Sequence, residues 1–433
     1  EVEAGAWRAM VEVVGLRQHA IVDGRRLSLA AESSIQRAGD PPHLRAELSM
    51  LLGAMHQAEG NDSEALREFD RALRIRRDRL PANPLALASA REGVGIALDG
   101  LGRHAEAVEH HAAVLSVREQ LLGTQHPLCG TALSHLGAAM LGANELRRAT
   151  ATLVRARMIL DPDGDVALDD IPEAEVRTTS TPVPDSPSRH ARQLAVVLDR
   201  LGLTMRGSEK LEAAFRLHSL SGATLAALPG HGRDLAYPLG NLGLALTELG
   251  RADEALPPLR RALELAESTL APGHQDRGLL HLNLANAAWA VGDVEDARTH
   301  YEHALRIWED ISDEHRWLSY ALTGLGRTRL AADDAPAAVE LLERAYDLRD
   351  HEQEDSMNLA ETSLLLARAL WATQRNPERA LELAMQARDL ARASEPANVS
   401  DLERLLSGAQ IFGLSDRLVP AGLGLIDRRH PPR

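Results

Sequence analysis

Residues 235–308 decide the fold of this chain, because they contain one pattern twice. The first copy reads LAYPLGNLGLALTELGRADEALPPLRRALEL from Leu235, and the second reads RGLLHLNLANAAWAVGDVEDARTHYEHALRIW from Arg277. Corresponding residues stand 42 positions apart, as Gly250 and Gly292 do. A fixed period of this length is typical of a protein built from stacked structural repeats.

Each copy predicts two helices. Gly250 ends the first helix, because glycine takes the left-handed cap conformation without steric cost. The second helix carries Ala255 and Ala262, where a small side chain lets two helices approach closely. Neither helix can bury its apolar stripe alone, so neighbouring repeats must cover it. The stripe of the first helix has the helical spacings four and three: Leu235, Leu239, Leu242, Leu246 and Leu249.

The same register extends over most of the chain. Steps between successive copies of the first alanine are 41 or 42 residues, except one step of 64. A small residue stands twelve positions before most of these alanines, and a second alanine stands seven positions after most of them. We therefore expect an all-α, helix-turn-helix solenoid of about eight to nine helix pairs. The alanines are Ala65, Ala107, Ala149, Ala213, Ala255, Ala297, Ala338 and Ala380.

The long step suggests a division into four segments. Residues 1–160 and 190–392 are predicted to be repeats. Residues 161–189 are acidic and rich in Pro, Ser and Thr without helical periodicity, which favours a disordered loop insertion. Residues 393–433 are expected to form a capping helix (Val399 to Ala409) and a loose tail.

Two local features qualify the repeat pattern. Residues 1–23 predict one helix that ends near Gly24, with Leu27 to Ala38 as its partner. Pro257 and Pro258 fall near the start of a second helix, which should therefore begin late or be kinked.

Composition narrows the function. Aromatic residues make up only 3%, so the core must consist mainly of Leu, Ala and Val. A net charge of −15 argues against nucleic acid or an anionic membrane as a partner. The single cysteine excludes a disulfide framework and a Cys-rich zinc site. No run of 18 apolar residues occurs, so no membrane insertion is expected.

The repeats resemble the tetratricopeptide repeat (TPR) in the longer, roughly 42-residue form of kinesin light chains. The turns Leu122-Gly123-Thr124-Gln125-His126-Pro127 and Leu270-Ala271-Pro272-Gly273-His274 are similar to that family's Leu-Gly-Pro-Asp-His-Pro turn. The resemblance covers about residues 44–390. It implies a right-handed superhelix that binds a peptide or protein in its concave groove, and it says little about which partner.

A narrower resemblance concerns the N-terminal half. Ala6-Trp7-Arg8-Ala9-Met10-Val11-Glu12-Val13-Val14-Gly15, Ala30-Ala31-Glu32 and Arg37-Ala38-Gly39-Asp40-Pro41 look like the C-terminal repeats of myxobacterial-type serine/threonine protein kinases. This resemblance implies an upstream kinase domain. The chain starts at Glu1 within a helical pattern, so we expect a fragment of a longer protein. Its location, cytoplasmic or periplasmic, then depends on sequence outside it.

Candidate chemistry is sparse. The chain has no His-Arg-Asp or Asp-Phe-Gly kinase motif. Gly93-Val94-Gly95 resembles a phosphate loop but stands where the repeat needs a small packing residue. His300 and His303 share a helix face without a third metal ligand. Cys129 opens a helix, which favours an acidified thiol, although a buried inert thiol fits the pattern better. We expect no catalytic residue, no metal and no cofactor.

The remaining candidate site is the inner surface of the first helices. Asparagine amides there offer a donor and an acceptor to a peptide main chain, and aromatic side chains offer apolar anchors. The opposing interpretation is that these side chains form hydrogen bonds or packing contacts between repeats. The candidates are Glu92, His135, Tyr237, Asn241, Leu279, Asn283, Asn286, Trp289, Tyr320 and Arg327.

Three hypotheses follow. The favoured one is a non-catalytic scaffold for a peptide or protein ligand, forming the regulatory or sensor region of a bacterial serine/threonine kinase. The alternative is the repeat arm of a signalling ATPase or transcription regulator. An enzyme within the chain itself is the least favoured.

Overall fold

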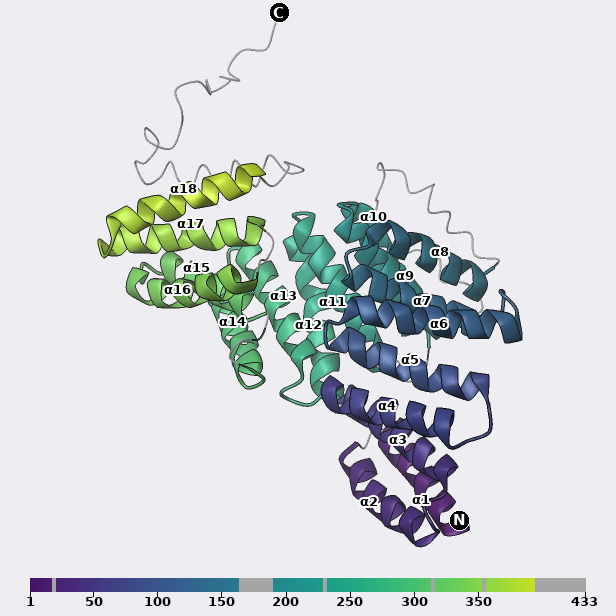
Figure 1. Ribbon diagram of the computed structural model, residues 1–433. Coiled ribbons are helices and arrows are strands. Elements are labelled where there is room, and N and C mark those ends of the chain that lie inside the picture. The colour runs from purple at the N-terminus through teal and green to yellow at the C-terminus, as the bar shows by residue number, and fades with distance from the viewer. Residues whose placement is uncertain are drawn as a thin grey trace, which may run out of the picture. The chain divides into compact units, whose positions relative to one another are not determined.

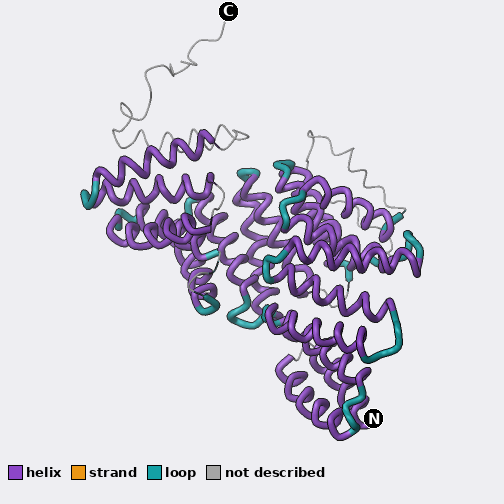
Figure 2. The backbone as a smooth tube through the Cα atoms, viewed as in Figure 1, coloured by secondary structure: helices purple, strands orange, loops and turns teal. Residues whose placement is uncertain are grey.

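The structure is a computed structural model that describes residues 1–17, 21–162, 190–228, 232–312, 315, 317–352 and 356–393. Within these ranges it contains eighteen α-helices and one π-helical segment, and no strand (Figure 1). Short loops connect most helices (Figure 2). The predicted all-α solenoid is confirmed, whereas the predicted capping helix and tail, and residues 163–189 of the predicted loop, lie outside the described residues.

The chain divides into two compact units, unit 1 (Glu1–His274) and unit 2 (Gln275–Arg433). Unit 1 begins with α1 (Val2–Val11), the π-helical segment η1 (Glu12–Arg17) and α2 (Ile21–Arg37). Its first helices are then α3 (Pro42–Ala58), α5 (Pro84–Gly100), α7 (Pro127–Gly142), α9 (Ala191–Gly207) and α11 (Gly232–Glu248). Their second helices are α4 (Asp62–Asp78), α6 (His104–Leu122), α8 (Leu146–Leu160), α10 (Leu211–Ala226) and α12 (Ala252–Thr269).

Unit 2 contains three helix pairs. Each first helix packs against its second helix, and α14 and α16 also pack against the first helix that follows. The pairs are α13 (Gln275–Val291) with α14 (Val294–Glu309), α15 (Leu318–Ala331) with α16 (Ala335–Glu352), and α17 (Ser356–Thr373) with α18 (Pro377–Ala393). No helix in the described part of the chain combines the length and the apolar character needed to cross a membrane.

A glycine on the first helix accommodates a large side chain of the second helix in most pairs. An added Cβ at Gly137 would lie 2.5 Å from Leu153 Cγ, and one at Gly53 would lie 2.8 Å from the Phe69 ring. Leu153 is fully buried, which stabilises the fold by roughly 1.5–3 kcal/mol. The small residue is therefore a packing requirement. The same contact joins Gly95 with His111, Gly202 with His218, Gly243 with Leu259, and Gly326 with Leu342.

The glycines Gly93 and Gly95 have this packing role. Added Cβ atoms would meet Phe69 at Gly93 and His111 at Gly95, and both glycines lie inside α5. The structure contains no strand–turn–helix context there, so the packing interpretation of this glycine motif is confirmed.

The turn between the two helices of a pair uses a left-handed residue. Gly102 has φ 74°, and Gly250 has φ 74°. Asn144, Glu209 and Asp333 adopt the same conformation with φ near 60° although they carry a Cβ. The backbone N–H of the first alanine then donates to the carbonyl four residues earlier, as Ala255 does to Arg251.

This hydrogen bond corrects the register at one repeat. The N–H of Ala214, not of Ala213, donates to the Lys210 carbonyl at the start of α10. Ala214 is fully buried, whereas Ala213 is 8% exposed. The equivalent alanine is therefore Ala214, because the adjacent alanine pair hid a shift of one residue in the sequence pattern.

One predicted helix end was wrong, and for a second helix one of the two predicted alternatives is excluded. The first helix does not continue to Gly24, because α2 begins at Ile21 and contains that glycine. An added Cβ at Gly24 would lie 2.5 Å from Gly15 Cα, so Gly24 permits a close helix contact and does not end a helix. Likewise α12 begins at Ala252, before Pro257 and Pro258, so a late start is excluded.

Candidate functional site on the first helices

Successive first helices approach one another, whereas successive second helices make at most marginal contact in the described residues. The approaching pairs are α3 with α5, α5 with α7, α7 with α9 and α9 with α11 in unit 1, and α13 with α15 and α15 with α17 in unit 2. The first helices therefore line the inner side of the curve within each unit. We call this surface the inner face.

Glu92 and His135, two of the predicted residues, contact each other across unit 1. His135 Nδ1 lies 3.1 Å from Glu92 Oε1, and Arg118 donates to both Glu92 oxygens at 2.8 and 2.6 Å. Burial alone would raise the pKa of Glu92, but the hydrogen bonds from His135 and Arg118 lower it to about 2. Burial also lowers the pKa of His135. The pair fixes α5 against α7.

Asn241 is also committed to its neighbouring helix. Its Nδ2 donates to Asp199 Oδ2 at 3.0 Å, and the other Asp199 oxygen lies 2.7 Å from His218 Nδ1. Tyr237, one turn earlier on α11, is 42% exposed. In unit 1 the asparagine therefore serves the contact between repeats, as the opposing interpretation states.

These contacts follow one rule. At three of the four steps between repeats of unit 1, the residue fifteen places before the first alanine of one repeat bonds to the residue fourteen places before the first alanine of the next; at the first step these positions are Met50 and Gly93, which form no such bond. The pairs are Glu92 with His135, Ser134 with Arg200 (2.7 Å from Oγ to Nη1), and Asp199 with Asn241. We call this series the inner-face ladder.

Asn283 occupies the ladder position of the next repeat but makes no side-chain hydrogen bond among the described residues. Asn283 is half-buried on α13. Its amide donor and acceptor both remain available to a ligand.

Three other predicted residues gather in unit 2. Asn286 accepts a hydrogen bond from the Tyr301 hydroxyl at 2.5 Å, and Arg327 donates to the same hydroxyl at 2.7 Å. The Arg327 guanidinium lies 4.6 Å from the Trp289 ring centroid. Arg327 also donates to Glu361 on α17 at 3.2 Å. This cluster connects α13, α14, α15 and α17 and fixes the orientation of Trp289 and Arg327.

Tyr320 belongs to a neighbouring set of contacts. Asn358 on α17 donates to its hydroxyl at 3.1 Å, the Arg349 guanidinium lies 4.4 Å from its ring centroid, and Trp317 lies 5.3 Å away. Tyr320 is half-buried. Its ring is held in place before any ligand arrives.

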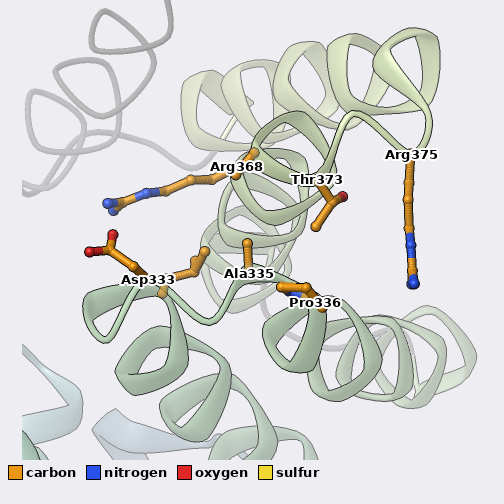
Figure 3. Close-up of a pocket in the computed structure, with 8 residues that line it drawn as sticks. Asp333, Ala335, Pro336, Arg368, Thr373 and Arg375 are labelled. Carbon is orange, nitrogen blue, oxygen red and sulfur yellow. The ribbon is translucent and has the colours of Figure 1, made fainter.

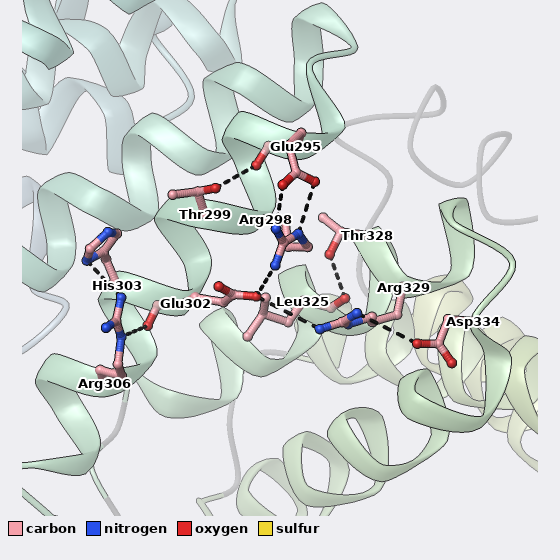
Figure 4. Close-up of polar contacts among 10 residues, drawn as sticks. All are labelled: Glu295, Arg298, Thr299, Glu302, His303, Arg306, Leu325, Thr328, Arg329 and Asp334. Atoms are coloured by element: carbon pink, nitrogen blue, oxygen red, sulfur yellow. Dashed lines mark hydrogen bonds and ion pairs between the residues drawn. The ribbon is translucent and has the colours of Figure 1, made fainter.

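An ion network joins α14 to α15 (Figure 4). Arg298 pairs with Glu295 and, at 2.5 Å, with Glu302. Arg329 lies 3.9 Å from Glu302 and 3.7 Å from Asp334. The hydrogen bonds that Arg298 donates to Glu295 and the charge of Glu302 raise the pKa of Arg298. Such exposed pairs contribute little stability each, but they hold α15 at a fixed register on α14.

The sequence analysis examined His300 and His303 as candidate metal ligands. In the structure, His281 lies next to both of them. His281 Nδ1 lies 3.0 Å from His300 Nδ1, and its ring stacks on His303 at 4.9 Å. Burial, followed by the charges of His300 and His303, lowers the pKa of His281 to about 3. Among the described residues, no group of three His, Cys, Asp or Glu side chains could hold a metal ion.

Cys129 is fully buried near the start of α7, and its thiol donates to the Gly123 carbonyl at 3.3 Å. Burial raises the pKa of this thiol. The inert-thiol interpretation is therefore favoured over an acidified one.

The sequence analysis did not identify the ladder pair Ser134 and Arg200. It also did not identify the partners of the predicted residues, namely Arg118, Asp199, Tyr301, Asn358 and Glu361. With Ala214 as the equivalent alanine, Arg200 occupies the place of Asn241 and Asp199 stands one place before it, so the repeat period alone did not point to Asp199. The ladder contacts join two different positions of the repeat, so comparing equivalent positions in the sequence does not reveal them. Only the structure shows which residues pair.

Comparison with known proteins identifies the repeats. Residues 86–160 and 276–351 match one model of the tetratricopeptide repeat, and residues 239–276 match a second. The chain carries tetratricopeptide repeats. Within the matched residues, α5, α7, α11, α13 and α15 are thus first helices of TPR units, and the predicted resemblance to this repeat is confirmed.

Two curated relatives come from Arabidopsis thaliana. Kinesin light chain-related protein 1 is 28% identical over 137 residues, which are 31% of this chain and 22% of the relative. Kinesin light chain-related protein 3 is 24% identical over 135 residues, 30% of this chain and 20% of the relative. The match thus spans about one fifth of the length of each.

Solved structures share the fold at low sequence identity. The apo quorum sensor NprR from B. thuringiensis has a TM-score of 0.55 at 12% identity, covering 90% of this chain and 97% of NprR. A Rap protein in complex with Competence and Sporulation Factor has a TM-score of 0.52 at 15% identity, covering 87% and 97%. Both support the TPR solenoid.

Proposed function

We propose that this TPR chain is a non-catalytic scaffold that binds a segment of another polypeptide along its inner face, with Asn283 as the main-chain anchor in unit 2. The observation that carries the proposal is the unpaired Asn283 amide. At the same position in unit 1, His135, Arg200 and Asn241 each bond to the preceding repeat. This position serves the packing between repeats elsewhere, whereas the Asn283 side chain makes no hydrogen bond to any described residue and can therefore bind a ligand.

The neighbourhood of Asn283 supports this role. An extended segment presents alternating N–H and C=O groups, and one amide side chain can satisfy one of each. Arg327 on α15 is held by Tyr301 and Glu361 and lies over the Trp289 ring on α13, so the two side chains supply an oriented cationic and aromatic surface. Preorganised side chains lose less conformational freedom on binding. The Rap protein of the same fold, solved with Competence and Sporulation Factor, is consistent with ligand binding.

Selection from a displayed library of random peptides tests the proposal. Peptides enriched on the parent chain should bind Asn283→Ala about tenfold more weakly, which corresponds to the loss of about 1.4 kcal/mol. Arg261→Gln in unit 1, which removes an exposed ion pair, is the matched control and should leave binding unchanged. Enriched peptides that bind Asn283→Ala and the parent equally would contradict the anchor.

A second part of the proposal concerns the parent protein. The resemblance of the N-terminal residues Ala6 to Gly15 to kinase-associated repeats supports a regulatory or sensor region of a bacterial serine/threonine kinase. The alternative is the arm of a signalling ATPase or transcription regulator. The gene sequence upstream of Glu1 distinguishes them: a kinase domain supports the first, and a Walker motif or a helix-turn-helix the second.

A further inference from the structure

A recess in unit 2 does not form a binding site. It lies between the α15–α16 turn and the C-terminal end of α17, and its charged residues are Asp333, Arg368 and Arg375. All three are exposed, and the two arginines extend away from each other (Figure 3). The recess therefore does not bring these charges together around one ligand.

Helix α1, at the start of unit 1, presents a different kind of surface (Figure 1). Ala6, Met10 and Val13 stand at the helical spacings four and three on α1 and η1, so they share one side of the helix. All three are exposed, Met10 by 45% and Val13 by 41%. We call them the α1 stripe. On the other side of the helix, Ala4 and Val11 are fully buried in one cluster with residues of α2 and α3.

Internal first helices carry the same stripe in the same place. Val11 is buried against α2, as Gly137 of α7 is against α8 and Gly95 of α5 is against α6. The α1 stripe stands five places before, one place before and two places after Val11. Apolar residues occupy the same three places around both glycines, and all six of them are buried. They are Ala132, Leu136 and Ala139 in α7, and Ala90, Val94 and Ala97 in α5.

The second helix of the preceding repeat covers this side of an internal first helix. Val94 and Ala97 of α5 lie in one core cluster with Ala65 and Phe69 of α4. The same kind of packing recurs between α6 and α7, α8 and α9, and α10 and α11. Single exposed apolar residues are common on folded proteins, but the terminal repeat of a solenoid needs a polar outer face. The α1 stripe instead has the composition of a covered face.

The small size of the α1 stripe indicates which occupant it accepts. A stable interface between separate proteins buries about 800 Å² on each partner. Association also costs translational and rotational freedom, which the buried surface must offset. Two apolar side chains and one alanine supply only a small part of such an interface. A helix joined to α1 by a short turn docks within one molecule and avoids that loss.

The repeats of unit 1 indicate where such a helix belongs in the sequence. Four residues separate α6 from α7, and five separate α4 from α5. The second helices α4, α6, α8 and α10 contain 15 to 19 residues. A helix of the same kind therefore fits within the 24 residues before Val2, of which five form the turn and nineteen the helix.

We propose that the α1 stripe is the docking surface for a further second helix, which the natural polypeptide supplies from the residues directly before Glu1. This helix is amphipathic, and its apolar side covers Ala6, Met10 and Val13. The contact continues the packing of second helix on first helix that unit 1 already shows. It involves neither unit 2 nor Asn283, so it does not depend on the scaffold function proposed above.

Hydrogen exchange followed by mass spectrometry tests the contact in two chains. One is the chain of 433 residues, and the other is lengthened at its N-terminus by the 42 residues, one repeat length, that precede Glu1 in its gene. Amides of α1 should exchange at least about tenfold more slowly in the lengthened chain, because a docked helix opposes local opening.

Met10→Glu distinguishes docking from a general effect of chain length. In the lengthened chain it should remove the protection of α1, because it buries a carboxylate without a partner. In the 433-residue chain it should leave exchange unchanged, because Met10 is exposed there. Met158→Glu on α8 is the matched control, since Met158 is 60% exposed, and it should change exchange of α1 in neither chain.

Several results would overturn the proposal. They are equal exchange of α1 in the two chains, protection that survives Met10→Glu, and an equal effect of Met10→Glu in both chains. A gene with fewer than 15 codons before Glu1, the length of the shortest second helix of unit 1, would also exclude it. Sedimentation of the 433-residue chain adds a further check. A dimer that Met10→Glu dissociates would make a second copy the occupant and overturn the proposal.

Discussion

At the scale of single residues, glycines on the first helices set how closely a helix pair packs. Gly137→Val should lower the free energy of unfolding by roughly 1–3 kcal/mol, because the new side chain overlaps Leu153. Gly5→Ala in α1, where no atom lies within 4 Å of the added Cβ, is the control and should not destabilise. Chemical denaturation measures both. Equal stability of Gly137→Val and the parent would show that the glycine contact is not a requirement.

The two ladder asparagines should respond differently to replacement. Asn241→Ala leaves Asp199 without one hydrogen bond and should cost roughly 1 kcal/mol of stability. Asn283→Ala breaks no described hydrogen bond and should leave the melting temperature unchanged. Thermal unfolding of both variants checks this contrast. A loss of stability in Asn283→Ala equal to that in Asn241→Ala would mean that Asn283 also serves repeat packing.

His281 should make unit 2 sensitive to acid. Its pKa falls from 6.5 to about 3 on folding, so between these values the unfolded chain binds a proton that the folded chain does not. Stability therefore rises with pH from about 3 to 6.5, by up to about 1.4 kcal/mol per pH unit from this group.

His281→Leu tests this effect, because most other repeats carry leucine at that position, as Leu239 and Leu322 show. The stability of this variant relative to the parent should increase as the pH falls below 6.5. Denaturant titrations at several pH values measure the difference. A difference that stays constant between neutral and acidic pH would contradict the buried, neutral His281.

At the scale of elements, the left-handed turn residue connects each helix pair. Gly102→Ala should cost about 1 kcal/mol, because φ 74° is unfavourable for a residue with a Cβ. Glu209→Ala should be nearly neutral, because Glu209 already bears a Cβ at φ 60°. Denaturation curves of the two variants give the comparison. Similar losses in both would show that the turn conformation does not govern the cost.

Sequence reasoning succeeded best at this scale, because the period of Leu, Ala and Gly is set by helix packing within each pair. It failed where one residue type has two roles. Gly24 was taken as a helix end although it permits contact with Gly15, and the pair Ala213 and Ala214 concealed a shift of register. Glycine at a close approach and glycine at a helix end are identical in sequence.

The candidate site was predictable only in part. The sequence named Glu92, His135, Asn241 and Asn283 from their place on the first helix, but it did not distinguish paired from unpaired residues. That distinction depends on contacts between repeats: Asp199 accepts from Asn241, whereas no described residue bonds to the Asn283 side chain.

At the scale of the whole molecule, contacts in a solenoid join neighbouring repeats, so damage should remain local. In Gly137→Val, hydrogen exchange should increase in α7, α8 and α9 and stay unchanged in α13 to α18. Exchange followed by mass spectrometry measures this by segment. An equal increase throughout both units would show that the two units unfold together.

The central claim is that a polypeptide segment binds along the inner face at Asn283. A photo-crosslinking amino acid at position 279, one turn before Asn283, tests it directly, with the same amino acid at exposed position 295 on α14 as the control. Peptides from the library selection should crosslink at 279, fail to crosslink at 295, and lose the crosslink when Asn283→Ala is added. Crosslinking at 295 alone, or equal crosslinking at both positions, would contradict the inner face as the binding surface.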